Sequence, residues 1–383
     1  MSAPHFNYFK EAFTGESRWW SWIMVFWFTI LGWLFVQIPI TGPIPDVARA
    51  ADPELGAQID QSMANMAANM DLVSVGLFTL LFLGGTLAGV LFWILNRNAK
   101  GSTQTIFGVL TGIGVATSMF GLIKLFPLMS DPEANSTLMK SIGVSPAAYM
   151  LFLLVFPFTL IALYLGQKFI HKRTVLSLHT AAKKIRWSRG MQAFFLTWVV
   201  LGSFTFIGHI SGLSPINTNF DAGRFAIYAL VSIIFLPMQS GTEEIVFRGY
   251  LNQGFAHVLK NKWIAFVITS VLFAAMHLSN PEALKGAEEG ILLLTMSSYF
   301  LFGFIACLMV WMDDGLESAI GFHAANNTFA AIFVNYEGSV LPTPSLFMAT
   351  PNTAIDVPIS LAAMTLIALI LYKTRKPLDM TFA

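Results

Sequence analysis

Long apolar runs separated by short polar segments dominate the chain from Trp19 onward. A bilayer core of about 30 Å is crossed by about 20 apolar residues in a helix. A helix also satisfies its own backbone hydrogen bonds in lipid. The pattern therefore predicts membrane-spanning helices, which we place near residues 19–40, 72–96, 105–127, 148–167, 191–211, 223–239, 263–279, 290–311, 318–335 and 356–372.

Composition agrees with this pattern. The chain is 55% hydrophobic and 11% charged, and its mean hydropathy is +0.66, so it is too apolar for a soluble protein. A net charge of +1 provides no basic surface for nucleic acid, and the single cysteine, Cys307, cannot form an internal disulfide. We predict an all-α polytopic bundle of eight to ten spans that has the lipid bilayer, and no nucleic acid, as a partner.

Lys and Arg gather in every second predicted loop, whereas the loops between them are acidic. The basic residues are Arg97, Lys100, Lys168, Lys172, Arg173, Lys183, Lys184, Arg186, Arg189, Lys260, Lys262, Lys373, Arg375 and Lys376. The acidic residues are Asp46, Asp52, Glu54, Asp60, Asp71, Asp131, Glu133, Glu282, Glu288 and Glu289. Because cytoplasmic loops carry an excess of Lys and Arg, both termini are predicted to be cytoplasmic. We expect a multi-pass protein of a prokaryotic inner or cell membrane.

Two segments near the N-terminus allow more than one interpretation. The triplet Ala48-Arg49-Ala50 has the form of a signal-peptidase site, but the apolar run 19–40 is long enough to span, so we favour a retained first helix. The Met- and Ala-rich stretch 53–70 is either an interfacial helix or an ordinary loop.

Polar residues gather first in the stretch SGTEEIVFRGYL, from Ser240 to Leu251. Pro237 interrupts the apolar run before it, so we expect a new helix to start at residues 240–242. On that helix Glu244 and Arg248 share a face, while Glu243 points about 100° away. Glu243 is then either a free carboxylate or, at the S-x-x-E spacing from Ser240, only a helix cap.

Two later predicted helices each carry a histidine paired with a second residue at a spacing of four residues. Phe273 precedes His277, and His323 precedes Asn327. Ionisable groups at membrane depth cost about 2.5 to 3.5 kcal/mol each and usually face a partner or a wet cavity. We therefore expect a polar cavity among the helices of the C-terminal half.

The three motifs, Glu-Glu-x-x-x-Arg, Phe-x-x-x-His and His-x-x-x-Asn, occur here in the order in which they occur in the CPBP superfamily. This superfamily, also called the Abi family, includes the type II CAAX prenyl endopeptidases, and the chain resembles it over roughly residues 190–335. The resemblance divides the chain into a variable N-terminal membrane region at 1–189, a catalytic core at 190–335, and a last segment at 336–383. That last segment is expected to hold an extracytoplasmic loop, the final span and a basic cytoplasmic tail.

The resemblance implies an intramembrane endopeptidase with its active site reached from the cytoplasmic side. Its substrate would be a membrane-associated or lipid-modified protein or peptide. Glu243 would be the general base that activates water, and His277 would help to hold that water. His323 and Asn327 would stabilise the oxyanion. The supporting residues would be Glu244, Arg248 and Phe273.

Metal dependence is open at this point. Glu243, His277 and His323 have the ligand types of a two-His, one-carboxylate zinc site. The chain contains no His-Glu-x-x-His motif, and a Glu243 that bound zinc would not be free to act as the base. We favour a glutamate mechanism without a metal and keep zinc as the alternative.

Other functions fit the residues less well. Met238 stands where a Gly-x-Ser-Gly serine motif needs its first glycine, and Asp313 with Asp314 reads as a solvated connection rather than an aspartyl dyad. A non-proteolytic role in the same family, as a bacteriocin-immunity protein or scaffold, is the main alternative. A transporter is a weaker one, because no paired polar positions mark two repeats.

Overall fold

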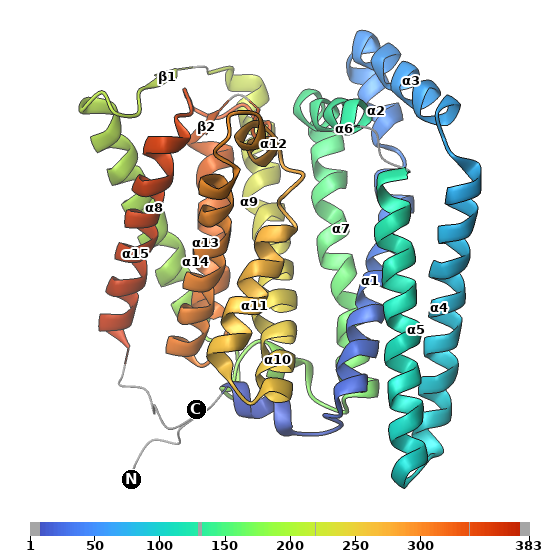
Figure 1. Ribbon diagram of the computed structural model, residues 1–383. Coiled ribbons are helices and arrows are strands. Elements are labelled where there is room, and N and C mark those ends of the chain that lie inside the picture. The colour runs from blue at the N-terminus through green and yellow to red at the C-terminus, as the bar shows by residue number, and fades with distance from the viewer. Residues whose placement is uncertain (1–7, 129–131, 219, 337, 376–383) are drawn as a thin grey trace. The chain divides into compact units, whose positions relative to one another are not determined.

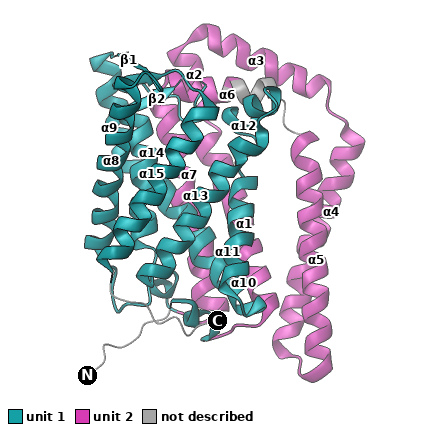
Figure 2. Ribbon diagram, turned by 60° about the vertical axis from the view of Figure 1, so that its left-hand side comes forward, with its two compact units in different colours: residues 1–14, 174–383 teal, residues 15–173 magenta. Residues whose placement is uncertain are grey.

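The computed structural model describes residues 8–128, 132–218, 220–336 and 338–375. Asp131, Lys376 and the rest of the predicted basic tail lie outside these ranges. The described chain is predominantly α-helical (Figure 1). It divides into two compact units, unit 1 with residues 1–14 and 174–383 and unit 2 with residues 15–173 (Figure 2).

Unit 2 consists of α1 (Trp19–Thr41), α2 (Ile44–Ala51), α3 (Pro53–Ala68), α4 (Leu72–Asn98), α5 (Gly101–Leu128), α6 (Pro132–Val144), α7 (Pro146–Leu165) and a π-helical turn, η2 (Gly166–Ile170). Asp52 and Asp71 cap α3 and α4 by accepting hydrogen bonds from the first backbone amides of each helix. A Cβ added at Gly85 of α4 would lie 2.5 Å from the backbone nitrogen of Ser118 in α5. Glycine therefore lets these two helices pack backbone against backbone.

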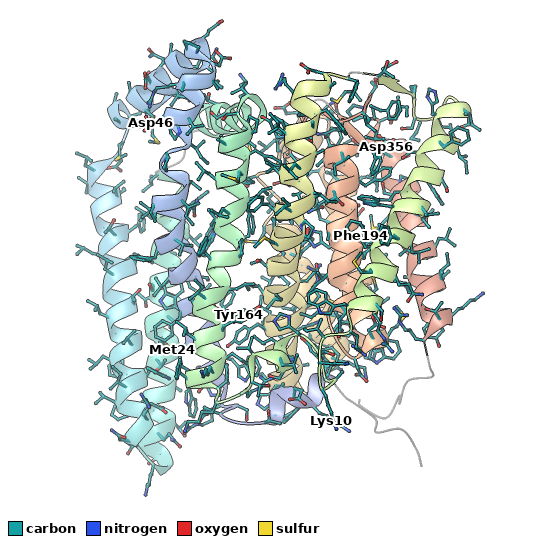
Figure 3. All side chains as sticks on the ribbon, turned by 180° about the vertical axis from the view of Figure 1, so that it is seen from behind. Lys10, Met24, Asp46, Tyr164, Phe194 and Asp356 are labelled. Atoms are coloured by element: carbon teal, nitrogen blue, oxygen red, sulfur yellow. The ribbon has the colours of Figure 1, made fainter. Side chains whose placement is uncertain are left out.

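The core of unit 2 is apolar and joins α1 to α5. Met24, Trp27 and Val115 form a buried cluster. Figure 3 labels Met24 of α1, and also Tyr164 of α7, the helix that packs along α1.

Unit 1 has more elements, several of them short. Its helices are η1 (Tyr8–Phe13), η3 (Val175–Leu178), α8 (Trp187–Ile210), α9 (Ala222–Glu244), η4 (Ile245–Leu251), α10 (Asn252–Leu259), α11 (Lys262–Ala275), α12 (Pro281–Glu288), α13 (Leu292–Asp313), α14 (Glu317–Ile332) and α15 (Thr353–Thr374). Its strands are β1 (Ile216–Thr218), β2 (Val334–Tyr336) and β3 (Phe347–Ala349). They form a sheet of order β1-β3-β2, in which β3 runs antiparallel to β1 and parallel to β2.

Eight helical segments in the described chain are long and apolar enough to cross a membrane, which confirms the lower end of the predicted range. The expected spans at 263–279 and 318–335 correspond to α11, with 14 residues, and α14, with 16 residues. Many large apolar side chains on the long helices are exposed, such as Leu80 and Phe35, as expected where lipid is the solvent. The protein is therefore an integral membrane protein.

The predicted helix start at residues 240–242 is wrong. Helix α9 runs without a break from Ala222 to Glu244 and contains Pro237. Neighbouring helices can satisfy the backbone groups that a proline frees in a membrane helix, so the residue does not end it. The Ser240 hydroxyl bonds to the Gln239 side chain instead of capping a helix, and Glu243 is consequently not a cap residue.

Helix α14 lies against both α8 and α9 and is deeply buried. A Cβ added at Gly321 would lie 2.1 Å from the carbonyl oxygen of Gly190, so α14 and the start of α8 touch through their backbones. Further along α8, the indole nitrogen of Trp198 donates to the Ala325 carbonyl of α14 at 3.0 Å. The ring of Phe194, labelled in Figure 3, lies 4.7 Å from that of Trp198. These contacts fix α14 along α8.

Candidate active site

The predicted motif residues of α9, η4 and α14 lie together in unit 1. Glu243 and Glu244 end α9, Arg248 belongs to the π-helical segment η4, and His323 and Asn327 lie one turn apart on α14. π-Helical turns inside longer helices are frequent at functional sites. Because α14 packs along α9, residues that are far apart in sequence come within hydrogen-bonding range.

Glu244 is the centre of a buried charged group. Its Oε1 accepts hydrogen bonds from Arg248 Nη1 at 3.0 Å and from His323 Nδ1 at 2.8 Å. The Glu244 and Arg248 side chains are 0% exposed, so this ion pair is screened from solvent. The Arg248 guanidinium also lies 4.1 Å from the centre of the Phe273 ring. Glu244 and Arg248 therefore hold His323 in a fixed orientation.

Glu243 is the more accessible of the two neighbouring carboxylates, with 18% of its side chain exposed. Its Oε1 accepts a hydrogen bond of 2.6 Å from Gln239 Nε2. Its Oε2 lies 3.6 Å from His323 Nε2, which is too far for a direct hydrogen bond and within reach of a bridging water. The Gln239 side chain thus holds Oε1 of Glu243, and Oε2 faces the His323 imidazole.

The two histidines are each oriented through Nδ1. His323 Nδ1 bonds to the Glu244 carboxylate, and His277 Nδ1 lies 2.7 Å from the Phe273 carbonyl oxygen. Carboxylate and carbonyl oxygens only accept hydrogen bonds, so both rings carry a proton on Nδ1. In the neutral rings Nε2 then keeps its lone pair and can accept a proton.

His277 lies beyond the last residue of α11 and is held by aromatic neighbours. Its ring stacks on the ring of Tyr299 in α13, with 4.4 Å between the ring centres. The centre of the Phe273 ring lies 4.6 Å from that of the His277 ring. It interacts electrostatically with Glu243 and His323. Phe273 itself contacts His277, His323 and Arg248, so it joins the second motif to the other two.

Asn327 points back to α9. Its Nδ2 donates to Gln239 Oε1 at 3.1 Å and to Ser240 Oγ at 3.2 Å, while its Oδ1 accepts from Asn326. Gln239 and Ser240 were missed as site residues from the sequence. The signal was present, because Gln239 lies four residues before Glu243 and shares its helix face once α9 continues past Pro237.

The residues considered for zinc do not form a metal site in this arrangement. Within the part of the chain that the structure describes, no three side chains of His, Cys, Asp or Glu come together in a way that could hold a metal ion. Glu243, His277 and His323 are the sequence-based candidates, and the bond from His323 Nδ1 to Glu244 leaves Nε2 as the only nitrogen of that ring that could bind an ion.

Asp313 and Asp314 are not the solvated connection expected from the sequence. Asp313 is 2% exposed and accepts hydrogen bonds from Arg189, Arg375 and Ser318. Asp314 has the left-handed backbone conformation that ends α13, and its Oδ1 accepts from the Tyr8 backbone amide. The expectation was wrong because basic residues distant in sequence converge on this short turn.

Comparison with known proteins agrees with the motifs. Residues 222–329, which include all seven predicted motif residues, match the family model described as Type II CAAX prenyl endopeptidase Rce1-like. The chain is also 30% identical over 251 residues to the uncharacterized protein YyaK of Bacillus subtilis (strain 168), a match that covers 64% of this chain and 81% of that protein. No solved structure matches the chain significantly. The chain belongs to the CPBP family, the family of the type II CAAX prenyl endopeptidase Rce1-like membrane proteins.

Proposed function

We propose that the protein is an intramembrane endopeptidase that hydrolyses a peptide bond of a membrane-associated or lipid-modified protein or peptide. The observation that carries this proposal is the pair formed by Glu243 Oε2 and His323 Nε2, which face each other across 3.6 Å. A water molecule to one side of this pair, within hydrogen-bond distance of both atoms, would contact a carboxylate base and an imidazole at once. Such a pairing of a base with an oriented second group is typical of hydrolytic sites.

In the proposed reaction Glu243 takes a proton from the water, and the resulting hydroxide attacks the carbonyl carbon of the substrate. His277, through its free Nε2, helps to orient the water. The carbonyl oxygen becomes an oxyanion as the new C–O bond forms. When the C–N bond breaks, Glu243 returns the proton to the leaving nitrogen, which gives an acid and an amine.

The oxyanion needs hydrogen-bond donors, and α14 supplies them. Asn327 donates from Nδ2 once the bond from this nitrogen to Ser240 Oγ is released, while the bond to Gln239 is retained. His323 donates through Nε2 whenever its ring carries a second proton. The Glu244 carboxylate, which accepts a hydrogen bond from Nδ1 of His323, would balance the charge of that protonated ring. Donors of this kind contribute about 3 to 4 kcal/mol each when they are fixed before the reaction.

We further propose the location and sidedness that the loop charges predict. The protein would lie in a prokaryotic cell membrane with both termini in the cytoplasm, and the site would open toward that side. The core at 190–335 would carry catalysis, and the N-terminal region at 1–189 would influence access of the substrate. Arg97 and Lys100 of unit 2 and Lys260 and Lys262 of unit 1 support this orientation by their loop positions.

The experiment offers the purified full-length protein a panel of membrane peptides, including prenylated peptides with a C-terminal CAAX sequence. We expect cleavage by the wild type and by Glu288→Gln, a matched change at an exposed glutamate of α12, and none by Glu243→Gln. Cleavage by Glu243→Gln at the wild-type rate would refute the assignment of the base. Loss of wild-type cleavage with a chelator, restored by zinc, would replace the metal-free mechanism by the zinc alternative.

A further inference from the structure

Gln239 is the side chain that joins the proposed base to the proposed oxyanion donor. Its Nε2 donates to Glu243 Oε1 at 2.6 Å, and its Oε1 accepts from Asn327 Nδ2 at 3.1 Å and from Ser240 Oγ at 3.2 Å. Only 8% of the residue is exposed. Both ends of the amide are therefore engaged inside the site.

The partners fix which way the amide points. A carboxylate oxygen only accepts, so Nε2 must face Glu243, and the Asn327 amide only donates through Nδ2, so Oε1 must face α14. The reversed amide would place two acceptors together at Glu243 and two donors together at Asn327. Glu243, Gln239 and Asn327 consequently form a directional chain from α9 to α14.

This chain has two effects on the proposed reaction. The hydrogen bond that Glu243 Oε1 accepts from Gln239 stabilises the ionised carboxylate that a general base needs. It also leaves Glu243 Oε2 turned toward His323. The hydrogen bond at Oε1 of Gln239 holds the Asn327 amide at a fixed distance from Glu243. Gln239 thus fixes the position of the Asn327 amide relative to the Glu243 carboxylate.

We propose that Gln239 is a positioning residue of the reaction, which acts through Glu243 and Asn327 and does not itself touch the substrate. This inference rests on the proposed role of Glu243. Leucine has nearly the same size as glutamine and no hydrogen-bonding group, so Gln239→Leu removes all three bonds while it retains the packing. Gln61→Leu is the matched control, because Gln61 makes an exposed bond to Asn65 four residues along α3.

The test compares kcat and KM for the wild type, Gln239→Leu and Gln61→Leu in detergent or liposomes. We expect Gln239→Leu to lower kcat by about 10- to 100-fold, the effect of losing a hydrogen bond to a charged group, with little change in KM. Gln61→Leu should match the wild type in every respect.

A merely structural role would predict a lower amount of folded protein with an unchanged kcat per folded molecule. An unchanged kcat in a Gln239→Leu protein that unfolds at the wild-type temperature would overturn the proposal. The double variant of Gln239→Leu and Asn327→Ala gives a second criterion: the two losses in kcat should be less than multiplicative, because one chain connects the residues. Fully multiplicative losses would also count against it.

A readout without catalysis separates this inference from the proposed function. Infrared difference spectra between the wild type and Glu243→Gln isolate the carboxylate band of Glu243, whose frequency depends on the hydrogen bonds that its oxygens accept. If no substrate is cleaved, endopeptidase activity fails, but a changed frequency of this band in Gln239→Leu still supports the positioning role. An unchanged frequency in Gln239→Leu would refute that role even in an active enzyme.

Discussion

Two buried polar clusters lie on or beside α14, and they use their charges in different ways. The site cluster consists of Glu243, Glu244, Arg248, His323 and Asn327. The end cluster consists of Asp313, Glu317, Arg186, Arg189 and Arg375. In the end cluster each carboxylate is held by arginine: Glu317 by Arg186 at 2.7 Å, and Asp313 by Arg189 at 2.9 Å and by Arg375.

The site cluster is not fully paired in this way. Among the described residues, Glu244 has Arg248, whereas Glu243 has the Gln239 amide and a histidine at 3.6 Å and no arginine. An arginine keeps its proton at any pH of interest, whereas glutamine provides no charge and histidine exchanges a proton near neutrality. The comparison indicates that the end cluster holds helices together, while the site cluster contains a carboxylate that no arginine among the described residues holds.

The largest expected effect comes from Glu243→Gln, which keeps the shape of the side chain and removes its basicity. Loss of a general base typically costs about 10²- to 10⁴-fold in rate. We expect kcat to fall by this factor while the unfolding temperature in detergent stays within error of the wild type. A variant that is inactive because it is unfolded would contradict the assignment of Glu243 to catalysis rather than to stability.

Asp313→Asn is the corresponding change in the end cluster. It leaves Arg189 and Arg375 without their charge partner. Removing one partner of a buried ion pair lowers the free energy of unfolding by about 3 kcal/mol or more, and we expect the lower value because Arg189 retains contact with solvent. Thermal unfolding in detergent should show a clear loss of stability, and kcat per folded molecule should remain near the wild-type value. Asp46→Asn, at an exposed pair with Arg49, serves as the control and should unfold like the wild type.

The pair of Glu317 and Arg186 predicts a pH dependence. Burial raises the pKa of Glu317, but the hydrogen bonds and charge of Arg186 outweigh it, so the pKa lies below its ordinary value of 4.5. The stability that this pair contributes is therefore complete above about pH 4.5 and is lost as the pH falls through the lowered pKa. Arg186→Gln removes these interactions, so that burial is no longer opposed and the pKa of Glu317 rises.

Arg186→Gln should consequently lower the unfolding temperature most at pH 7, and the difference from the wild type should shrink when both are measured at pH 4. Arg49→Gln, at an exposed salt bridge, should show no comparable dependence on pH. An equal difference at both pH values would mean that Arg186 stabilises the protein through packing alone.

The smallest effect is expected for Ser318→Ala. The Ser318 hydroxyl donates to Asp313 and accepts from Arg375 Nη2 at 2.8 Å, so its loss weakens the end cluster without uncovering a charge. The cost should be about 1 kcal/mol in the free energy of unfolding. Ser203→Ala removes a hydroxyl that bonds only to its own helix, and it should leave the unfolding temperature unchanged.

The sequence indicates which candidate residues pair locally, but not how the pairs are arranged in space. Helical periodicity places His323 and Asn327 on one face of α14, whereas Arg248 lies in the π-helical segment η4 and His277 lies beyond the end of α11. Which pair meets which depends on how α14 packs along α8 and α9. The contact between Gly321 and Gly190, for example, depends on two residues that have no detectable link in sequence.

The errors have one physical origin, because each treated a local signal as decisive. Pro237 usually breaks a helix in water, yet α9 continues through it, and Gln239 was overlooked as a result. Asp313 lies in a short connection, where exposure is the usual outcome, but arginines from α8 and from the end of α15 cover it. Tertiary packing decided both cases.

The π-helical segment η4 has a consequence for the comparison of relatives. A π turn holds one residue more than the α-helical turn it replaces, and each residue of an α-helix corresponds to a rotation of about 100°. Deleting one residue between Ile245 and Leu251 would restore a regular helix and turn the buried Asn252 and Gln253 away from Cys307 and the Ser177 carbonyl. Single-residue gaps in this stretch therefore mark relatives in which α10 faces a different set of neighbours, even when the Glu-Glu-x-x-x-Arg motif is intact.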